Sequence, residues 1–127
     1  MANAVNTQIL VDGERNAVVK ITGVLDTSDV AIQQIVLPSS FSPVPNQFRI
    51  DYIDYAIADG LEIRIFWDAP TPVDILPIAG RGRMAFWNFG GLQNNAVGAT
   101  GAIDLSTHGW ATGDILNFSL VLEMVKQ

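Results

Sequence analysis

His108 is the only histidine in the chain, so it is the first residue to consider as a catalytic base. Ser106 and Asp104 precede it at alternate positions, and all three side chains would share one face of a strand. A catalytic triad needs a serine bonded to its base and a base oriented by the acid, which closeness in sequence does not supply. The chain has no cysteine and no Gly-x-Ser-x-Gly elbow. We therefore expect no catalytic residues and interpret His108 as a turn or interface histidine at a strand end.

Pairs of acidic residues could bind a metal ion or act together on a glycosidic bond. Oxygen-rich loops of β-sandwich domains can hold Ca²⁺, but none of the pairs has the spacing of a known calcium loop. Asp51 and Asp54 would point to opposite faces of one strand unless a bulge realigns them, which weakens a glycosidase interpretation. We expect no metal and no cofactor. We interpret Asp26 and Asp29 as part of a turn whose side chains bond local amides. The pairs are Asp12 with Glu14, Asp26 with Asp29, and Asp51 with Asp54.

Two glycine-containing segments could receive an anion. Residues 80–83 (Gly-Arg-Gly-Arg) place two cations beside flexible backbone, where a phosphate or carboxylate could bind. The simpler interpretation is a turn whose arginines pair with surface acids. Gly90-Gly91 precedes neither a helix nor a Lys-Ser/Thr pair, so it is not a phosphate-binding loop.

The aromatic residues could form a sugar-binding platform, a protein interface or part of the core. In residues 84–89 (Met-Ala-Phe-Trp-Asn-Phe), Phe86 and Trp87 cannot both face the core of a sandwich. One of them should meet a loop, a partner or solvent, and the same holds for Phe66 beside Trp67.

Composition indicates one globular domain spanning residues 1–127. Hydrophobic residues make up 49% of the chain and charged residues 16%, so partner protein, further copies or uncharged polar residues should cover part of the surface. A net charge of −6 repels phosphate backbones, so we expect no nucleic acid as partner. The N-terminus has no basic region, and the apolar run at residues 9–11 is too short for a signal peptide or a membrane span. We expect a soluble cytoplasmic product with no membrane partner.

Short β-branched or alternating apolar stretches are separated every eight to twelve residues by Gly, Pro, Asn or Asp. This spacing predicts an all-β fold, a two-sheet antiparallel sandwich of about eight or nine strands, jelly-roll-like rather than Ig-like. The expected strands cover residues 7–11, 17–25, 31–37, 48–57, 61–67, 73–78, 84–88, 102–107 and 116–125.

Several residues indicate how the strands should connect. Asp12-Gly13 favours a hairpin, and Asp59-Gly60 predicts a second hairpin between residues 48–57 and 61–67. Gly23 suggests a bulge or a close approach of backbone. The phase of alternation changes within residues 48–57, which predicts a one-residue bulge.

The remaining segments can be assigned to loops, edge strands or central strands from their prolines, their glycines and the alternation of apolar residues. The proline-rich residues 38–45 should cross from one sheet to the other, and Pro77 indicates an edge strand. Residues 80–82 should join two strands, and residues 90–98 should form a long loop. Unbroken alternation from Leu116 to Met124 predicts a central C-terminal strand.

The chain resembles the small β-sandwich proteins of tailed-bacteriophage structural modules, in particular the cement or decoration proteins that clamp the outside of icosahedral capsids. The resemblance implies a jelly-roll-like sandwich, oligomers at capsid symmetry axes and no enzymatic activity. The residues that carry it cover most of the chain: the opening 6–26, Ile57-Ala-Asp-Gly-Leu61, Gly80-Arg-Gly-Arg-Met84, Phe89-Gly-Gly-Leu-Gln-Asn-Asn95 and the ending 120–126.

We therefore expect a virion structural protein on the capsid exterior, made in the host cytoplasm, that binds the major capsid protein and forms a dimer or trimer. A cement protein needs a rigid sandwich with ends or loops that reach its neighbours. The segments expected to dock are an extended N-terminal arm within residues 1–8 and the loops 38–45 and 90–101. The alternatives are a carbohydrate-binding head or tail module, and a hydrolase with a deep pocket lined by His108 and acids. The candidate interface residues are Val5, Gln8, Phe41, Trp87, Phe89, Leu92 and Trp110.

Overall fold

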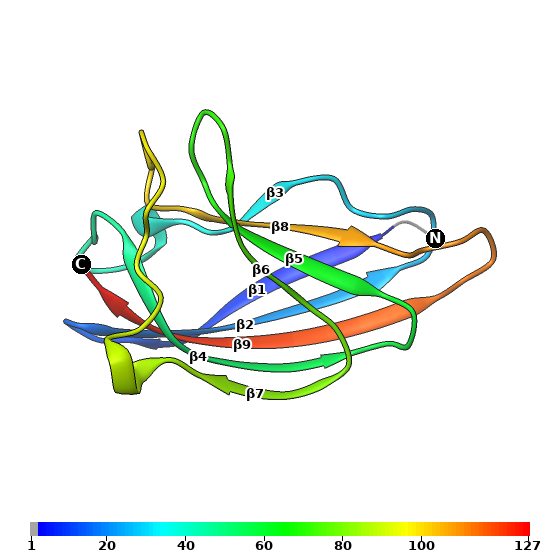
Figure 1. Ribbon diagram of the computed structural model, residues 1–127, viewed down its shortest axis with the longest axis horizontal. Coiled ribbons are helices and arrows are strands. Elements are labelled where there is room, and N and C mark those ends of the chain that lie inside the picture. Colours follow the sequence, from blue (N-terminus) through cyan, green and yellow to red (C-terminus); the bar gives the residue numbers. More distant parts are fainter. Residues whose placement is uncertain (1–2) are drawn as a thin grey trace.

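Two antiparallel β-sheets face one another in this computed structural model, which describes residues 3–127 (Figure 1). One sheet has the order β1-β2-β9-β4-β7 and the other β3-β8-β5-β6, so the predicted sandwich of eight or nine strands is confirmed. The strands are β1 (Ala4–Asp12), β2 (Asn16–Leu25), β3 (Gln33–Val36), β4 (Phe48–Ile57), β5 (Glu62–Trp67), β6 (Val73–Ile78), β7 (Arg81–Ala85), β8 (Ile103–His108) and β9 (Leu116–Lys126); two 3-10 turns are η1 (Pro38–Ser40) and η2 (Trp87–Phe89).

The strand pairing is that of a jelly roll. β2 pairs with β9, β3 with β8, β4 with β7 and β5 with β6, as in one long antiparallel hairpin folded over on itself. Pairing of β4 with β9 and of β5 with β8 joins these pairs into two sheets. β1 extends the larger sheet beyond β2. This order differs from that of an Ig-like sandwich.

Buried apolar side chains at alternate positions of the strands form the core between the two sheets. Every second residue is buried in β2, in β5 and in β9 from Phe118 to Met124, and side chains from both sheets join one hydrophobic cluster. β9 lies between β2 and β4, which confirms the predicted central C-terminal strand. Fully buried members of the cluster include Val19, Ile21, Ile50, Ile53, Ile63, Ile65, Ile103, Leu105, Leu120 and Leu122.

The predicted bulge in β4 is confirmed at Asp51. Ile50 pairs with Met124 and Tyr52 pairs with Glu123, so Asp51 is the extra residue. The extra residue shifts the phase, and Ile50 and Ile53 both reach the core although they are three positions apart.

The predicted hairpin across Asp59-Gly60 is wrong. β4 belongs to the five-stranded sheet and β5 to the four-stranded sheet, so the turn carries the chain across the sandwich. Leu61 N–H donates to Ala58 O at 3.1 Å within this turn. The aliphatic faces of the two strands lie on opposite sides of the shared core, and each strand finds its hydrogen-bonding partners elsewhere in the chain.

Three other predictions, about two connections and one edge strand, are confirmed. Asp12-Gly13 leads into the β1–β2 hairpin, where Gly13 N–H donates to Asn16 O at 2.9 Å. Residues 38–45 cross from β3 in one sheet to β4 in the other. β6, which contains Pro77, is an edge strand.

Two element boundaries differ from expectation. Residues 4–8 of the predicted N-terminal arm are part of β1, because their backbone groups pair with β2; Met1 and Ala2 lie outside the described residues. β7 covers Arg81–Ala85 rather than residues 84–88, since Arg81, Gly82 and Arg83 pair with β4, and η2 follows. The expectation that Phe86 and Trp87 alternate within a strand therefore fails.

Gly23 has no bulge, because the register with both neighbouring strands runs through it without a shift. It pairs with Phe118 on β9, and a Cβ at this position would overlap atoms Cε1 and Cζ of the Phe118 ring. Glycine is required here by the space that the buried ring occupies.

We expect Gly23→Ala to lower the free energy of unfolding by about 1–3 kcal/mol, because a methyl group enters a filled core. Urea denaturation at neutral pH measures the change. The matched control is Gly13→Ala, whose new Cβ would meet Asn16 O at an ordinary 3.4 Å and should leave stability close to that of the parent. Equal stability of the two variants would contradict this account of Gly23.

Within residues 3–127, no helix is long and apolar enough to cross a lipid bilayer.

Candidate docking site

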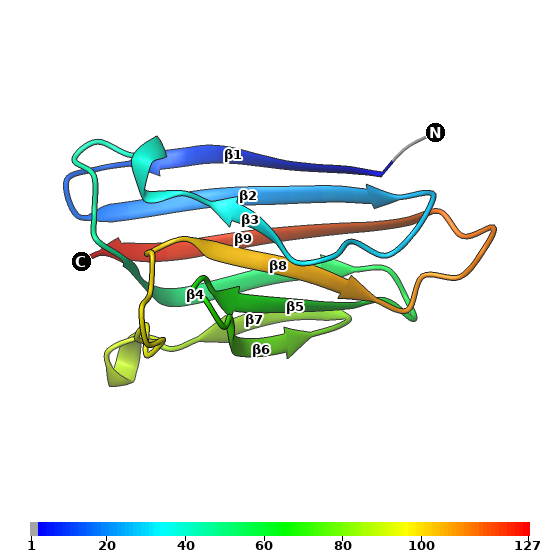
Figure 2. The ribbon, with the colours of Figure 1, turned by 90° about the horizontal axis from the view of Figure 1, so that it is seen from above.

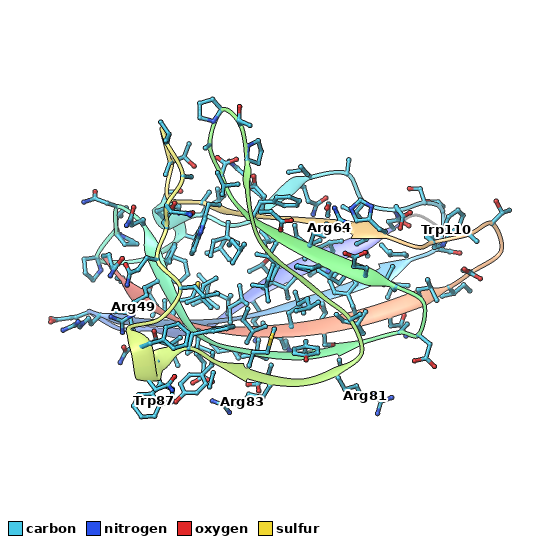
Figure 3. The ribbon with its side chains drawn as sticks, viewed as in Figure 1. Arg49, Arg64, Arg81, Arg83, Trp87 and Trp110 are labelled. Atoms are coloured by element: carbon cyan, nitrogen blue, oxygen red, sulfur yellow. The ribbon has the colours of Figure 1, made fainter. Side chains whose placement is uncertain are left out.

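The most exposed aromatic side chains of the described residues follow β7 at one end of the sandwich. Trp87 is 57% exposed and Phe89 66% exposed. Both belong to η2, and with Phe86 and Asn88 they form a segment that we name the aromatic turn (residues 86–89). The Trp87 side chain projects away from the sheets, at the end opposite Trp110 (Figure 3). The prediction that one of Phe86 and Trp87 meets solvent is confirmed for Trp87.

The bulge in β4 holds the aromatic turn in place. Phe86 N–H donates to the carbonyl oxygen of the bulged Asp51 at 2.7 Å, and Gly91 N–H donates back to Phe86 O at 2.8 Å. Gly90 ends η2 with φ +93°, a left-handed conformation that suits glycine. The rings of Phe86 and Phe89 meet edge to face, with centroids 6.2 Å apart. The exposed rings are therefore presented by a fixed backbone.

An ion pair lies under the aromatic turn. Arg49 Nε donates to Asp51 Oδ1 at 2.8 Å and Arg49 Nη2 donates to Asp51 Oδ2 at 3.1 Å, a two-point contact. This hydrogen bond raises the pKa of the Arg49 guanidinium. A Cβ on Gly91 would overlap both side chains, so the backbone that follows the aromatic turn sits directly on the pair.

Leu92 continues from the aromatic turn into the loop of residues 90–101. Its N–H donates to Ile50 O at 2.8 Å, and Ile50 N–H donates to Leu92 O at 3.1 Å. The side chain is half-buried and packs against the core. Leu92 thus helps to fasten the loop and exposes less apolar surface than Trp87 or Phe89.

The other predicted interface residues lie in different places. Phe41 is 3% exposed and packs edge to face on Phe48, so it belongs to the core, and its prediction as a docking residue is wrong. Trp110 is half-buried, and its indole N–H donates to Asp114 O at 3.0 Å. Val5 is half-buried and Gln8 exposed on β1 at the edge of the larger sheet. The seven residues therefore do not form one surface, and only Trp87 and Phe89 are close together and open to solvent.

A serine and a histidine meet on the outer face of the smaller sheet. Ser106 Oγ lies 3.4 Å from His108 Nε2 in a shallow groove of about 500 Å³. Asp104 and His108 are four strand positions apart, roughly 13 Å along the strand, so Asp104 does not orient the imidazole. Asp29, at the border of the groove, accepts from Thr107 Oγ1 and from Trp110 N–H at 3.1 Å each. The arrangement lacks the acid-to-base contact of a triad.

Asp104 takes part in a different contact, with Asp68 at the end of β5. Asp104 is 1% exposed, and its burial, followed by a hydrogen bond with Asp68 and the charge of that carboxylate, raises the pKa of Asp104 to about 7. Asp68 also accepts from Thr100 Oγ1 at 2.6 Å and from Gln34 Nε2 at 3.2 Å. The hydrogen bond with Asp104 has the largest effect on the pKa of Asp68 and lowers it, and the hydrogen bonds from Thr100 and Gln34 lower it further. Of these two neighbouring carboxyl groups, Asp104 is thus favoured in the neutral form and Asp68 in the charged form.

The remaining charged candidates make structural contacts. Arg83 donates to Glu123 at 2.9 Å and stacks on Tyr52, 4.3 Å from the ring centroid, which confirms the prediction of a surface ion pair for this arginine. Asp12 accepts from Lys126 Nζ at 2.7 Å. Among residues 3–127, no three His, Cys, Asp or Glu side chains gather as they would around a metal ion.

Comparison of the chain with known protein families, with curated proteins and with solved structures found no match. The function is therefore inferred from the residues of the chain itself.

Proposed function

We propose that this chain is a non-enzymatic virion structural protein that docks through its aromatic turn onto the outside of a capsid and stabilises the shell. Its partner is the major capsid protein, it acts as a dimer or trimer on the capsid exterior, and it is made in the host cytoplasm. The observation that carries the proposal is the exposed pair Trp87 and Phe89 on a turn fixed to β4.

The chemistry of the aromatic turn favours a protein partner. Tryptophan and phenylalanine are enriched at the buried centres of protein interfaces, where they fill pockets on the partner. The hydrogen bonds of Phe86, Gly90 and Gly91 already fix the backbone, so docking orders few additional groups. Two exposed rings on one short turn can then act as an anchor.

A shell presents the same docking site many times. A single anchor of two aromatic rings gives a modest affinity, but linked copies bound to neighbouring subunits multiply it by raising the effective concentration of each next contact. A small rigid sandwich with one apolar anchor is sufficient for this task and needs no catalytic group.

Co-sedimentation of the purified chain with shells that lack it tests the proposal. We expect saturable binding to the shells, and we expect Trp87→Ala and Phe89→Ala each to weaken it by about tenfold or more, the loss typical of an interface anchor. Ile115→Ala is the matched control, because Ile115 is also exposed (62%) but lies in the loop before β9, outside the aromatic turn, and binding should be unchanged. No binding of the parent to shells, or parental binding by both aromatic variants, would contradict the proposal.

The carbohydrate-binding alternative makes a different prediction for Trp87. An exposed indole can stack on a sugar ring, whereas Trp110 is half-buried and its N–H is already bonded. Binding to a glycan array that is lost in Trp87→Ala, together with no affinity for shells, would favour the alternative.

A further inference from the structure

Three of the four sheet edges in residues 3–127 carry features that prevent another strand from adding to them. Charged side chains, prolines and short length are the usual protections of an edge strand. β7 carries Arg81 and Arg83, β6 carries Asp74 and Pro77, and β3 has four residues and an irregular register. The fourth edge is β1, which lies along one border of the molecule (Figure 2).

Over residues 4–9 the β1 edge has none of these protections, since its own register shift comes only at Leu10. Residues 4–11 contain no charged residue and no proline, and exposed apolar side chains end the segment. Leu10, at the register shift of β1, is 47% exposed and Val11 is 45% exposed. The one charged residue of the strand, Asp12, is bonded to Lys126. A chain with a net charge of −6 therefore has, along one side, an uncharged strand whose outer edge pairs with no other strand of the described residues.

The sequence of this edge matches itself in reverse. Around Thr7, the residues at equal distances on either side are chemically alike: Asn6 with Gln8, and Val5 with Ile9. Val5, Thr7 and Ile9 pair with inward positions of β2, whereas Asn6 and Gln8 pair with outward ones, so each like pair shares one face of the sheet. The pattern continues to Ala4 and Leu10 at the ends.

We infer that two copies of this chain pair through antiparallel β1 strands about a two-fold axis at Thr7. Thr7 then lies opposite Thr7 of the partner copy, Asn6 opposite Gln8 of the partner copy, and Val5 opposite Ile9 of the partner copy. Side chains directly opposite one another on the same face interact. Asn6 and Gln8 can exchange amide hydrogen bonds and Val5 can pack on Ile9, while Thr7 Oγ1 keeps its hydrogen bond to Ile35 O at 2.8 Å. The two five-stranded sheets become one continuous sheet of ten strands.

Two observations favour a second copy over a strand of another protein. Reverse self-similarity is what a two-fold interface requires, since the same surface serves both partners. The pairing also hides both β1 edges at once and leaves β7, with its arginines, at each outer border. Ile9 lines an apolar groove of about 190 Å³ together with Ile35 and Leu37, and Val5 lies on the same face of β1, so pairing would extend this apolar surface across both copies.

Sedimentation velocity of the purified chain, in the absence of any shell, tests the inference. We expect a monomer–dimer equilibrium with a mass limit of twice the chain mass. The variant Asn6→Lys/Gln8→Lys places lysines opposite lysines and should weaken the dimer by about 100-fold or more, since like charges opposed at an interface cost several kcal/mol. Asn6→Glu/Gln8→Glu should weaken it in the same way, and an equal mixture of the two variants should form a heterodimer in native mass spectrometry.

The control is Ala56→Lys/Ala85→Lys, which adds two lysines at exposed positions of β4 and β7 and should dimerise as the parent does. Circular dichroism confirms that each variant is folded. A parent that stays monomeric at high concentration, a closed trimer, lysine variants that dimerise like the parent, or a mixture without heterodimer would each overturn the inference. Because the measurement involves no shell, its failure would leave the docking proposal to its own test.

Discussion

Asp104→Asn is expected to stabilise the protein at pH 8 by on the order of 4 kcal/mol and to change its stability little at pH 4. The pKa of Asp104 rises from 3.8 in the unfolded chain to about 7 in the fold. Each pKa unit corresponds to about 1.4 kcal/mol, which gives the expected magnitude for a shift of this size. Asparagine keeps the shape of the neutral acid and can donate its amide N–H to Asp68.

The direction with pH follows from proton binding. Between pH 4 and 7 the folded chain holds a proton on Asp104 that the unfolded chain has released, so the fold loses stability as pH rises through this window. Asp68, whose pKa is lowered, contributes the opposite slope, and its contribution is lost as pH falls below its ordinary pKa of 3.8. The parent should therefore be most stable in mild acid, and Asp104→Asn should remove the decline toward pH 8.

Urea denaturation at half-unit steps from pH 4 to pH 8.5 measures both curves. Asp59→Asn, in the exposed turn between β4 and β5, is the control because it also removes one negative charge, and its curve should run parallel to that of the parent. A parent whose stability does not fall between pH 4.5 and 8, or an Asp104→Asn variant less stable than the parent at pH 8, would contradict this account of Asp104 and Asp68.

Gly101→Ala is expected to lower the free energy of unfolding by about 3 kcal/mol or more, through two separate effects. Gly101 has φ +90°, where a side chain costs about 1–2 kcal/mol. A Cβ would also overlap the carbonyl oxygen of Asn46, and backbone atoms cannot rotate away as a side chain can. The segment around Asn46 is itself fixed, since Asn46 N–H donates to Gln127 O at 2.9 Å.

Gly90→Ala separates the two effects. Gly90 has φ +93°, almost the same conformation, but nothing lies within 4 Å of the position of its Cβ. This variant should lose only the conformational part, about 1–2 kcal/mol. Thermal and urea unfolding of both variants give the difference, and equal losses would show that the contact with Asn46 is unimportant.

The features that the sequence predicted well are those decided by neighbouring residues. The change of alternation phase in residues 48–57 predicted a one-residue bulge, which the structure places at Asp51, and this bulge anchors the aromatic turn. Trp87 and Phe89 were predicted as interface residues and are exposed, although residues 87–89 form the turn η2 and not the strand on which the argument for Trp87 rested. Pro77 marked an edge strand because proline cannot donate to a neighbouring strand.

The features that the sequence did not predict depend on contacts between distant segments. Asp59-Gly60 fits a hairpin and a crossing between sheets equally well, and the pairing of β4 with β9 and β7 decides between them. Asp68 and Asp104 are far apart in the chain, and only the ends of β5 and β8 bring them together. Phe41 lies in a proline-rich connection, where burial against Phe48 has no local signal.

An electron cryo-microscopy map of shells incubated with the purified chain would show whether the aromatic turn docks on the capsid. We expect density for the nine-stranded sandwich on the outer surface of the shell, with Trp87 and Phe89 buried against the capsid subunit. Bare shells at saturating concentrations of the chain, or bound copies in which the aromatic turn faces solvent, would contradict it.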